Sequence, residues 1–179
     1  VVVAARHLEL RELRAIKFML PAALENDVAV ERFFREARAV VGLKSQHVTR
    51  VHDMGRLDDG APYIVMEYLE GRDLKQLLKQ RGSLPVGEAV SHVLQAGEAL
   101  MEAHAAGVIH RDPKPANLFL TTGARAEACI KVLDFGIAKL IGGADASEEQ
   151  TASSSFVGTP SYMSPEQMRG QGIDARCDV

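Results

Sequence analysis

The order of the elements constrains this chain most, because strand-like runs fill its first third and helical patterns fill most of the rest. Two β-like runs cover residues 1–5 and 13–20, and the second stops before a proline. Two further runs cover residues 48–57 and 63–69, and the Asp-Asp-Gly at 58–60 predicts a turn whose glycine supplies a positive φ. Strands gathered before helices predict an α+β protein with two segregated lobes.

One helix interrupts the strands of the first third. Asn26 or Asp27 is expected to cap it, because either side chain can accept a hydrogen bond from the first turn. Its apolar residues recur every three or four positions and predict one buried face. That face comprises Val30, Phe33, Phe34, Ala37, Val40 and Val41.

Helical and hairpin patterns follow Gly71. Residues 73–80 predict a short helix, and Pro85 opens a longer one that ends near Gly107. The longer helix carries the apolar residues Val90, Val93, Leu94, Leu100 and Met101. Two apolar runs then predict a small hairpin, and a later stretch of small and acidic residues predicts a flexible surface loop. These segments are residues 118–120 and 130–133 for the hairpin and residues 142–155 for the loop.

The bulk composition excludes several function classes. With 179 residues, of which 46% are apolar and 25% charged, the chain can form one sizeable core or two small lobes that share a cleft. Its net charge of −3 gives no electrostatic basis for binding nucleic acid or an anionic membrane surface. No apolar run reaches the length of a transmembrane helix, and the N-terminus lacks a signal-peptide pattern. Cys129 and Cys177 lack metal-ligand spacing and predict reduced thiols in the cytoplasm.

Lys17 and Glu36 form the first pair of candidate functional residues. Lys17 closes an apolar strand, and alone it is more typical of a solvated strand end. Glu36 follows Phe33 by one helical turn, which puts a carboxylate at the edge of the buried face, where an unpaired charge is costly. Glu36 could turn into water or pair with Arg32 on its own helix. We predict instead that Lys17 reaches Glu36 across the interface between strand and helix.

Two later clusters carry acids. Residues 110–117 read His-Arg-Asp-Pro-Lys-Pro-Ala-Asn and offer an acid, a cation and an amide close together. The two prolines predict a fixed loop. A charged surface turn would explain any part of this loop but not the full set. Asp134 ends the predicted hairpin and precedes Phe-Gly, an arrangement that on its own is also typical of a plain turn.

Together these residue types meet the chemical demand of phosphoryl transfer from ATP. That reaction needs metal ions against the phosphates, a cation on the α- and β-phosphates, and a carboxylate that orients the attacking hydroxyl. Asp134 and Asn117 offer the hard oxygen ligands that Mg²⁺ prefers. Lys17 is the candidate phosphate cation, and Asp112 is the candidate carboxylate.

In this order, the clusters resemble the motifs of the eukaryotic-type serine/threonine protein kinases, over nearly the whole chain. Residues 15–17 look like the β3 lysine motif, and Glu36 stands where the αC glutamate is expected. Residues 110–117 resemble the catalytic loop, and residues 134–136 resemble the magnesium-binding Asp-Phe-Gly. Residues 158–166 resemble the segment that receives the protein substrate. The residues around these motifs are similar to those of bacterial members.

The resemblance implies a two-lobed protein-kinase-like fold with ATP between the lobes. Residues 1–69 would form a small antiparallel β lobe without its glycine-rich loop, and residues 70–179 the first part of the helical lobe with the activation segment. Adenine is expected against the strand and hinge of residues 63–69. The implied nucleotide contacts are Lys17, Glu36, Val2, Ala15, Met66 as gatekeeper, Glu67, Leu69 and Phe119, with ATP and Mg²⁺ as cofactors.

The substrate class also follows from the resemblance. Lys114, two residues after Asp112, is typical of serine/threonine kinases, and Thr159 matches the threonine that bridges these two residues. The implied catalytic residues are Asp112, Lys114, Asn117 and Thr159, and the implied partners are a protein substrate and a second copy for trans-autophosphorylation. Arg111 implies activation by phosphorylation of a nearby loop. The candidate sites are Thr151, Ser153, Ser154 and Ser155, although a flexible serine-rich loop is the simpler explanation of any single one.

The chain also departs from the kinase pattern. The glycine-rich phosphate loop and the arginine that normally pairs with Glu166 are missing, and the chain begins without Met inside a strand-like run. We therefore expect a fragment that is not competent alone. Pro113 stands where the family has leucine, removes a backbone donor and biases Asp112 towards an extended conformation.

Two rival functions stay open. A pseudokinase would bind nucleotide or a partner without transferring phosphate; Pro113 and the missing ends favour it, whereas the complete set of polar site residues opposes it. A small-molecule kinase of similar fold, such as an aminoglycoside or choline phosphotransferase, is the other. Lys114 and residues 158–166 oppose this second rival, because they resemble parts that bind a protein substrate.

Overall fold

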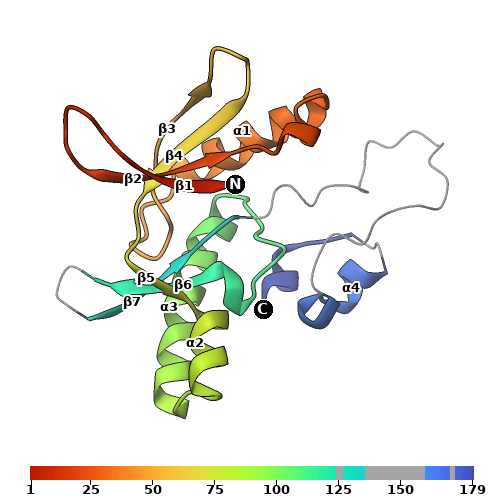
Figure 1. Ribbon diagram of the computed structural model, residues 1–179. Helices are drawn as coiled ribbons and strands as arrows, with labels where there is room; N and C mark the ends of the chain where they lie inside the picture. The colour runs from red at the N-terminus through yellow and green to blue at the C-terminus, as the bar shows by residue number, and fades with distance from the viewer. Residues whose placement is uncertain (124–126, 136–159, 170–171) are drawn as a thin grey trace.

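The computed structural model describes residues 1–123, 127–135, 160–169 and 172–179, which form two β-sheets with helices around them (Figure 1). The four-stranded antiparallel sheet has the order β1-β2-β4-β3, and the three-stranded antiparallel sheet has the order β5-β6-β7. The strands are β1 (Val2–Arg6), β2 (Leu13–Phe18), β3 (Val51–Arg56), β4 (Pro62–Glu67), β5 (Gly71–Asp73), β6 (Leu118–Thr122) and β7 (Ala128–Val132). Antiparallel strands with segregated helices confirm the predicted α+β class.

The helices fall into two groups along the chain. α1 packs against the first sheet, whereas α2 and α3 pack against the second sheet (Figure 1). An ion pair between Arg81 and Glu88 at 2.7 Å joins α2 to α3. The helices are α1 (Asp27–Val41), α2 (Leu74–Arg81), α3 (Val86–Ala105) and α4 (Pro165–Met168). Single turns of 3₁₀ helix are η1 (Pro21–Ala23), η2 (Pro115–Asn117), η4 (Pro160–Tyr162) and η5 (Ala175–Asp178).

β2, β3 and β4 are shorter than the apolar runs that predicted them, whereas β1 keeps the predicted length and begins one residue later. β3 begins at Val51 rather than Val48, because Val48 instead forms a parallel bridge with Val132 of the second sheet. The predicted turn before β4 is confirmed. Gly60 has a φ of +85°, and its N–H donates to the Leu57 carbonyl at 2.9 Å.

α1 packs against the first sheet through an apolar face. The Asn26 side chain accepts a hydrogen bond from Ala29 N at 3.1 Å, so Asn26 rather than Asp27 is the cap. The buried residues of this contact are Val30, Phe33, Phe34, Ala37 and Ile64. The prediction was wrong for Val41, which is 61% exposed at the end of the helix. Val40 turns towards the second core instead.

The second core lies between α2, α3 and the second sheet. α3 contacts β7 with a face of small residues, and Ala99 and Ala103 have no exposed surface at all. Small side chains on this face let the helix approach the sheet closely. Several of its larger apolar residues lie on the opposite face. Those exposed residues are Val86, Val90, Val93, Leu94 and Met101.

The linker between the sheets lies directly on β6. Gly71 has a φ of +148°, and a Cβ atom added there would stand 2.0 Å from the Leu120 carbonyl oxygen. One residue earlier, the Glu70 carbonyl accepts a hydrogen bond from Thr121 Oγ1 at 2.7 Å. The linker therefore leads straight from β4 into the edge strand β5, which is too short for a recognisable sequence pattern.

Candidate active site

Lys17 and Asp134 meet where the two sheets face each other. The Lys17 Nζ atom donates to Asp134 Oδ1 at 2.7 Å. Lys17 belongs to β2 of the first sheet, and Asp134 follows β7 of the second. Asp134 has a φ of +49°, a conformation that is uncommon outside glycine and concentrates at functional sites. The predicted phosphate cation and the predicted metal ligand therefore share one site.

Several predicted participants lie outside the described residues. Glu36 belongs to α1, but its side chain is not described, so the Lys17–Glu36 ion pair stays a prediction. Thr159, Gly136 and the loop predicted at residues 142–155 also lie outside the described residues. The same holds for the candidate phosphorylation sites Thr151, Ser153, Ser154 and Ser155.

Asp112 lies at the centre of a short polar cluster. The Lys114 Nζ atom donates to Asp112 Oδ2 at 2.6 Å. The Asn117 Nδ2 atom donates to the Asp112 carbonyl at 2.9 Å and to Asp112 Oδ2 at 3.2 Å. The side chains of Asp112 and Lys114 are mostly buried, at 14% and 20% exposed. The structure thus brings together three of the four predicted catalytic residues.

A carboxylate to which the sequence analysis assigned no role anchors this loop. The buried Asp178 side chain accepts hydrogen bonds from His110 N at 2.7 Å and Arg111 N at 2.6 Å. His104 Nε2 lies 2.8 Å from Asp178 Oδ2. A buried carboxylate needs such donors, and they hold Arg111 at a φ of +66°. This anchoring role could not be predicted from local sequence, because the backbone partners of Asp178 lie 67 and 68 positions away in the chain.

His110 connects the loop to the segment that carries Asp134. Asp112 N donates to His110 Nδ1 at 3.2 Å, so the other ring nitrogen carries the proton and donates to the Leu133 carbonyl at 2.9 Å. The ring also packs against Phe135, with centroids 5.0 Å apart. Burial lowers the pKa of His110 from its ordinary 6.5, which favours the neutral imidazole that these two hydrogen bonds require.

Asn117 and Asp134 flank neighbouring ends of β6 and β7. The Leu133 N–H donates to the Asn117 carbonyl at 2.9 Å, which fixes the two segments side by side. The Asn117 amide nitrogen is engaged by Asp112, so the amide oxygen is the atom suited to an ion. Asp134 Oδ1 accepts the hydrogen bond from Lys17 Nζ, and Oδ2 is the second oxygen of this carboxylate. These hard oxygen donors fit Mg²⁺.

Of the residues predicted to contact the nucleotide, Lys17 and Met66 line one small cavity. Strand register sets Val2 opposite Lys17 and Ala15 opposite Met66, and Phe119 lies on β6. The cavity extends behind Met66 between α1 and the sheets. It is lined by Lys17, Ala37, Val40, Thr49, Val51, Ile64, Met66, Val132, Asp134 and Phe135.

Glu67 and Leu69 lie at the start of the linker. The Glu67 carboxylate does not point to an open cleft, because Oε1 accepts from Arg50 N at 2.8 Å and from Lys131 Nζ at 2.7 Å. Any contact between Glu67 and a nucleotide would therefore use its backbone. Leu69 is half-buried beyond the end of β4.

The segment that begins at Pro160 contacts the loop of residues 110–117. Ser164 caps α4, and its side chain and that of Gln167 form a reciprocal capping box. The Gln167 Nε2 atom also donates to the Arg111 carbonyl at 2.8 Å. Part of the region predicted to receive the substrate thus lies beside the Asp112 loop.

Comparison with known proteins points to one family. A protein kinase domain matches residues 1–179. The chain is 42% identical over 175 residues to the serine/threonine-protein kinase pkn3 of Myxococcus xanthus, covering 98% of this chain and 32% of that protein. It is 40% identical over 179 residues to the serine/threonine-protein kinase PknB of Mycobacterium leprae, covering 98% of this chain and 28% of that protein. The chain spans a third or less of the length of these relatives.

Solved structures agree with this match. The kinase domain of PknI from Mycobacterium tuberculosis superposes with a TM-score of 0.73 at 34% identity, covering 99% of this chain and 63% of that chain. A double mutant of the same domain gives a TM-score of 0.74. The similarity confirms the two-lobed protein-kinase-like fold predicted from the motifs.

Proposed function

The chain belongs to the protein kinase domain family, and we propose that the full-length protein transfers the γ-phosphate of ATP to serine or threonine hydroxyls of other proteins. The observation that carries this proposal is the cluster around Asp112. Its carboxylate is held by Lys114 at 2.6 Å and by Asn117 at 3.2 Å. A fixed carboxylate beside a fixed cation suits a hydroxyl that attacks a phosphoryl group.

Each described side chain has a distinct part in this proposal. Asp112 accepts the hydrogen bond of the attacking hydroxyl, orients it and takes its proton, an effect worth about 10²–10⁴ in rate. Lys114 stabilises the charge on the phosphoryl group in transfer. Lys17 binds the α- and β-phosphates. Mg²⁺, held when bound by oxygens of Asn117 and Asp134, supplies neutralisation of phosphate charge.

The remaining site assignments belong to the same proposal. Thr159 bridges Asp112 and Lys114, and Glu36 pairs with Lys17 when the site is assembled. The adenine and ribose contact a set of apolar and linker residues on both sides of the cleft. These residues are Val2, Ala15, Met66, the backbone of Glu67, Leu69 and Phe119.

We also propose regulation by phosphorylation of the loop that contains Thr151 and Ser153–Ser155. Arg111 lies next to Asp112 with its backbone fixed by Asp178, so a phosphate near its guanidinium would stabilise the catalytic loop. A second copy of the protein is the proposed enzyme for this step. Among the described residues, no helix is both long and apolar enough to cross a membrane. A cytoplasmic site of action is proposed because ATP is the substrate.

A nucleotide-binding pseudokinase is the second candidate, and Pro113 is the observation in its favour. Proline at this position removes a backbone N–H next to the proposed base. The Asp112 carboxylate nevertheless keeps Lys114 and Asn117 as polar partners in the same loop. A small-molecule kinase is less well supported, because the relatives named above are serine/threonine-protein kinases.

The decisive experiment is a phosphorylation assay of the full-length protein with γ-labelled ATP, magnesium and a generic basic protein. We expect labelled phosphoserine or phosphothreonine after acid hydrolysis, and we expect Asp112→Ala to abolish the label. Binding of ATP without any transfer would support the pseudokinase. Transfer to an amino sugar or choline, but not to protein, would support the small-molecule kinase.

A further inference from the structure

Lys131 is a buried lysine in the middle of an otherwise apolar strand. It lies on β7 between Ile130 and Val132, which belong to the second core. Only 8% of the residue is exposed. Its ammonium donates to Glu67 Oε1 at 2.7 Å and to the Val48 carbonyl at 3.4 Å. The proposed phosphoryl transfer assigns no task to this ammonium.

The Lys131–Glu67 pair joins the two sheets. Glu67 is the last residue of β4 in the first sheet, whereas Lys131 lies on the central part of β7 in the second. Glu67 is also bonded to Arg50, the residue that precedes β3. The Glu67 carboxylate accepts a hydrogen bond from Arg50 N at 2.8 Å, and the Glu67 N–H donates to the Arg50 carbonyl at 3.0 Å. The pair therefore links the end of β4, next to the start of β3, to the second sheet.

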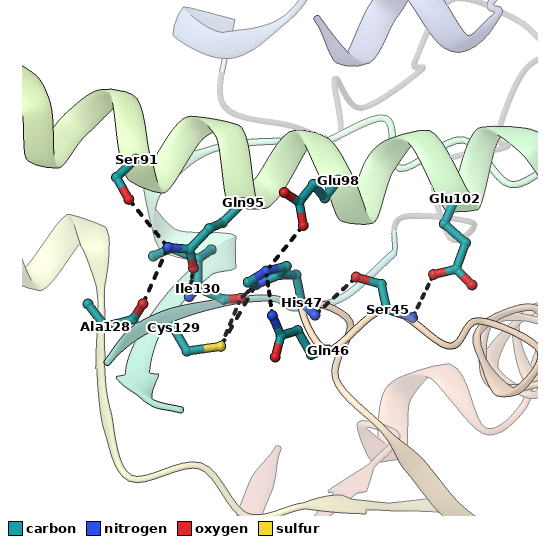
Figure 2. A network of polar contacts seen from close by, with 10 residues as sticks. All are labelled: Ser45, Gln46, His47, Ser91, Gln95, Glu98, Glu102, Ala128, Cys129 and Ile130. Atoms are coloured by element: carbon teal, nitrogen blue, oxygen red, sulfur yellow. Dashed lines mark hydrogen bonds and ion pairs between the residues drawn. The ribbon is translucent and has the colours of Figure 1, made fainter. Parts of the chain in front are cut away.

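The segment that precedes Arg50 is fastened to the second sheet and to α3. Glu102 of α3 accepts hydrogen bonds from the Lys44 and Ser45 N–H groups, both at 2.6 Å, and His47 Nδ1 lies 2.8 Å from the Ile130 carbonyl. Figure 2 shows how the Glu102, Ser45, His47 and Ile130 contacts follow one another along the helix. Residues 44–47 are therefore held by α3 and the second sheet rather than by the first sheet.

The hydrogen bonds between this segment and the second sheet end at Thr49, two residues before β3 begins. Val132 N donates to the His47 carbonyl at 2.7 Å, and Thr49 donates to the Val132 carbonyl through N at 3.3 Å and through Oγ1 at 3.0 Å. Just after Thr49 the chain enters the first sheet. Lys131 lies at this boundary, with the Val48 carbonyl on one side and Glu67 on the other. The pair therefore limits rotation of one sheet relative to the other.

Lys17 and Asp134 lie on opposite sides of this boundary and contact each other across it. Lys17 lies on β2, whose register with β4 is fixed, and Asp134 follows β7 three residues after Lys131. We propose that Lys131 is a positioning residue for ATP: by holding Glu67 it keeps the two sheets in the orientation that brings Lys17 and Asp134 together. This inference rests on the proposed kinase function. Loss of the pair lowers the fraction of molecules with a competent cleft, which weakens apparent ATP binding by the same factor.

The experiment compares variants of the full-length protein. For Lys131→Met, we expect the KM for ATP to rise about fivefold while kcat changes by less than about twofold, because binding competence is lost and not a transition-state contact. Lys131→Arg, which keeps the charge, should restore KM to within about twofold of the natural protein. Calorimetric Kd values for magnesium–ATP should follow KM.

A double variant separates positioning from simple stability. Lys131→Met leaves the Glu67 carboxylate without its ammonium partner, so we expect a lower melting temperature. The double variant Lys131→Met with Glu67→Gln removes that unpaired charge, so it should recover most of the melting temperature. We expect KM to stay raised in the double variant, because the link between sheets is still missing. Recovery of KM together with the melting temperature would overturn the inference and leave Lys131 a purely structural residue.

Arg81→Met is the matched control. The Arg81–Glu88 ion pair, at 2.7 Å, joins α2 and α3 within one half of the molecule and crosses no sheet boundary. We expect an unchanged KM for ATP, and a rise equal to that of Lys131→Met would also overturn the inference. If the natural protein binds ATP but transfers no phosphate, the proposed function fails, and the Kd comparison still decides whether Lys131 positions the nucleotide site.

Discussion

The Lys17 ammonium lies 2.7 Å from Asp134 Oδ1, although 117 positions separate the two residues in the sequence. Local sequence does not predict this contact, since Lys17 lies near the end of β2 and Asp134 follows β7. The contact exists because β2 and β7 belong to different sheets that face each other across the site. A cation and a carboxylate fixed this way can bind opposite sides of a metal–triphosphate group.

Replacing Lys17 should separate catalysis from folding. Lys17→Met keeps the length of the side chain but removes the charge that faces Asp134. We expect autophosphorylation of the full-length protein to disappear while its circular dichroism spectrum and melting behaviour stay close to those of the natural protein. Retained autophosphorylation would remove Lys17 from the site.

ATP binding should depend strongly on magnesium. Asn117 and Asp134 present oxygen ligands at adjacent strand ends, and ATP alone would bring its phosphate charge next to the Asp134 carboxylate. Calorimetry of the full-length protein should show at least about tenfold weaker ATP binding without magnesium, or about 1.4 kcal/mol. Asp134→Asn should reduce this difference. Equal affinities with and without magnesium would contradict the assignment.

Gly71 should tolerate no side chain. A Cβ atom at this position would lie 2.0 Å from the Leu120 carbonyl oxygen, and the φ of +148° is unfavourable for any other residue. Gly71→Ala should therefore lower the free energy of unfolding by about 1–3 kcal/mol or more. Gly42 offers the control, because a Cβ there has open space and its φ is −76°. Gly42→Ala should change the stability by less than about 1 kcal/mol in urea denaturation.

His110 should bind its proton only under acidic conditions. Burial lowers its pKa below 6.5, so the unfolded chain takes up a proton at a higher pH than the folded chain does. The stabilisation from neutral His110 is therefore complete above about pH 6.5 and is lost as the pH falls from there towards the folded pKa. NMR titration of the imidazole, assigned with a His110→Gln variant, should give a midpoint below 6.5. A midpoint at or above that value would contradict the buried neutral ring.

Local patterns predicted most of the elements and the Asp112 cluster. Asn26 caps α1 because its side chain acts within four residues, and Lys114 and Asn117 reach Asp112 within one short loop. These interactions are close in sequence, so residue type and spacing are sufficient to predict them.

The parts that sequence reasoning missed depend on contacts between distant segments. Asp178 and Lys131 gain their roles from backbone groups and a carboxylate more than sixty positions away. A lysine inside the apolar run of residues 130–133 was nevertheless a signal, because a buried ammonium requires a partner. Periodicity also failed to show which face of α3 is buried, since Ala99 and Ala103 face the sheet while Val93 is exposed.

Pro113 is the residue that decides between a working and a disabled kinase. It lacks a backbone donor, and a misplaced base could forfeit the ~10²–10⁴ in rate that a positioned one contributes. In the structure, however, the loop is anchored before Pro113 by Asp178 and after it by the contacts of Lys114 and Asn117 with Asp112. Proline therefore sits between two fixed points that do not use its missing N–H.

We accordingly expect the natural protein to be active, Pro113→Leu to raise kcat modestly, and Asp112→Ala to remove nearly all turnover. The measurement is steady-state phosphorylation of a generic basic protein by the three full-length proteins, with ATP binding measured on each to confirm an intact cleft. Kinases usually turn over at ~1–100 s⁻¹, so a partial defect would still leave a signal well above the Asp112→Ala background. If the natural protein and Asp112→Ala are equally inert while Pro113→Leu turns over, the proline has disabled the base, and phosphate transfer is not the function of the natural protein.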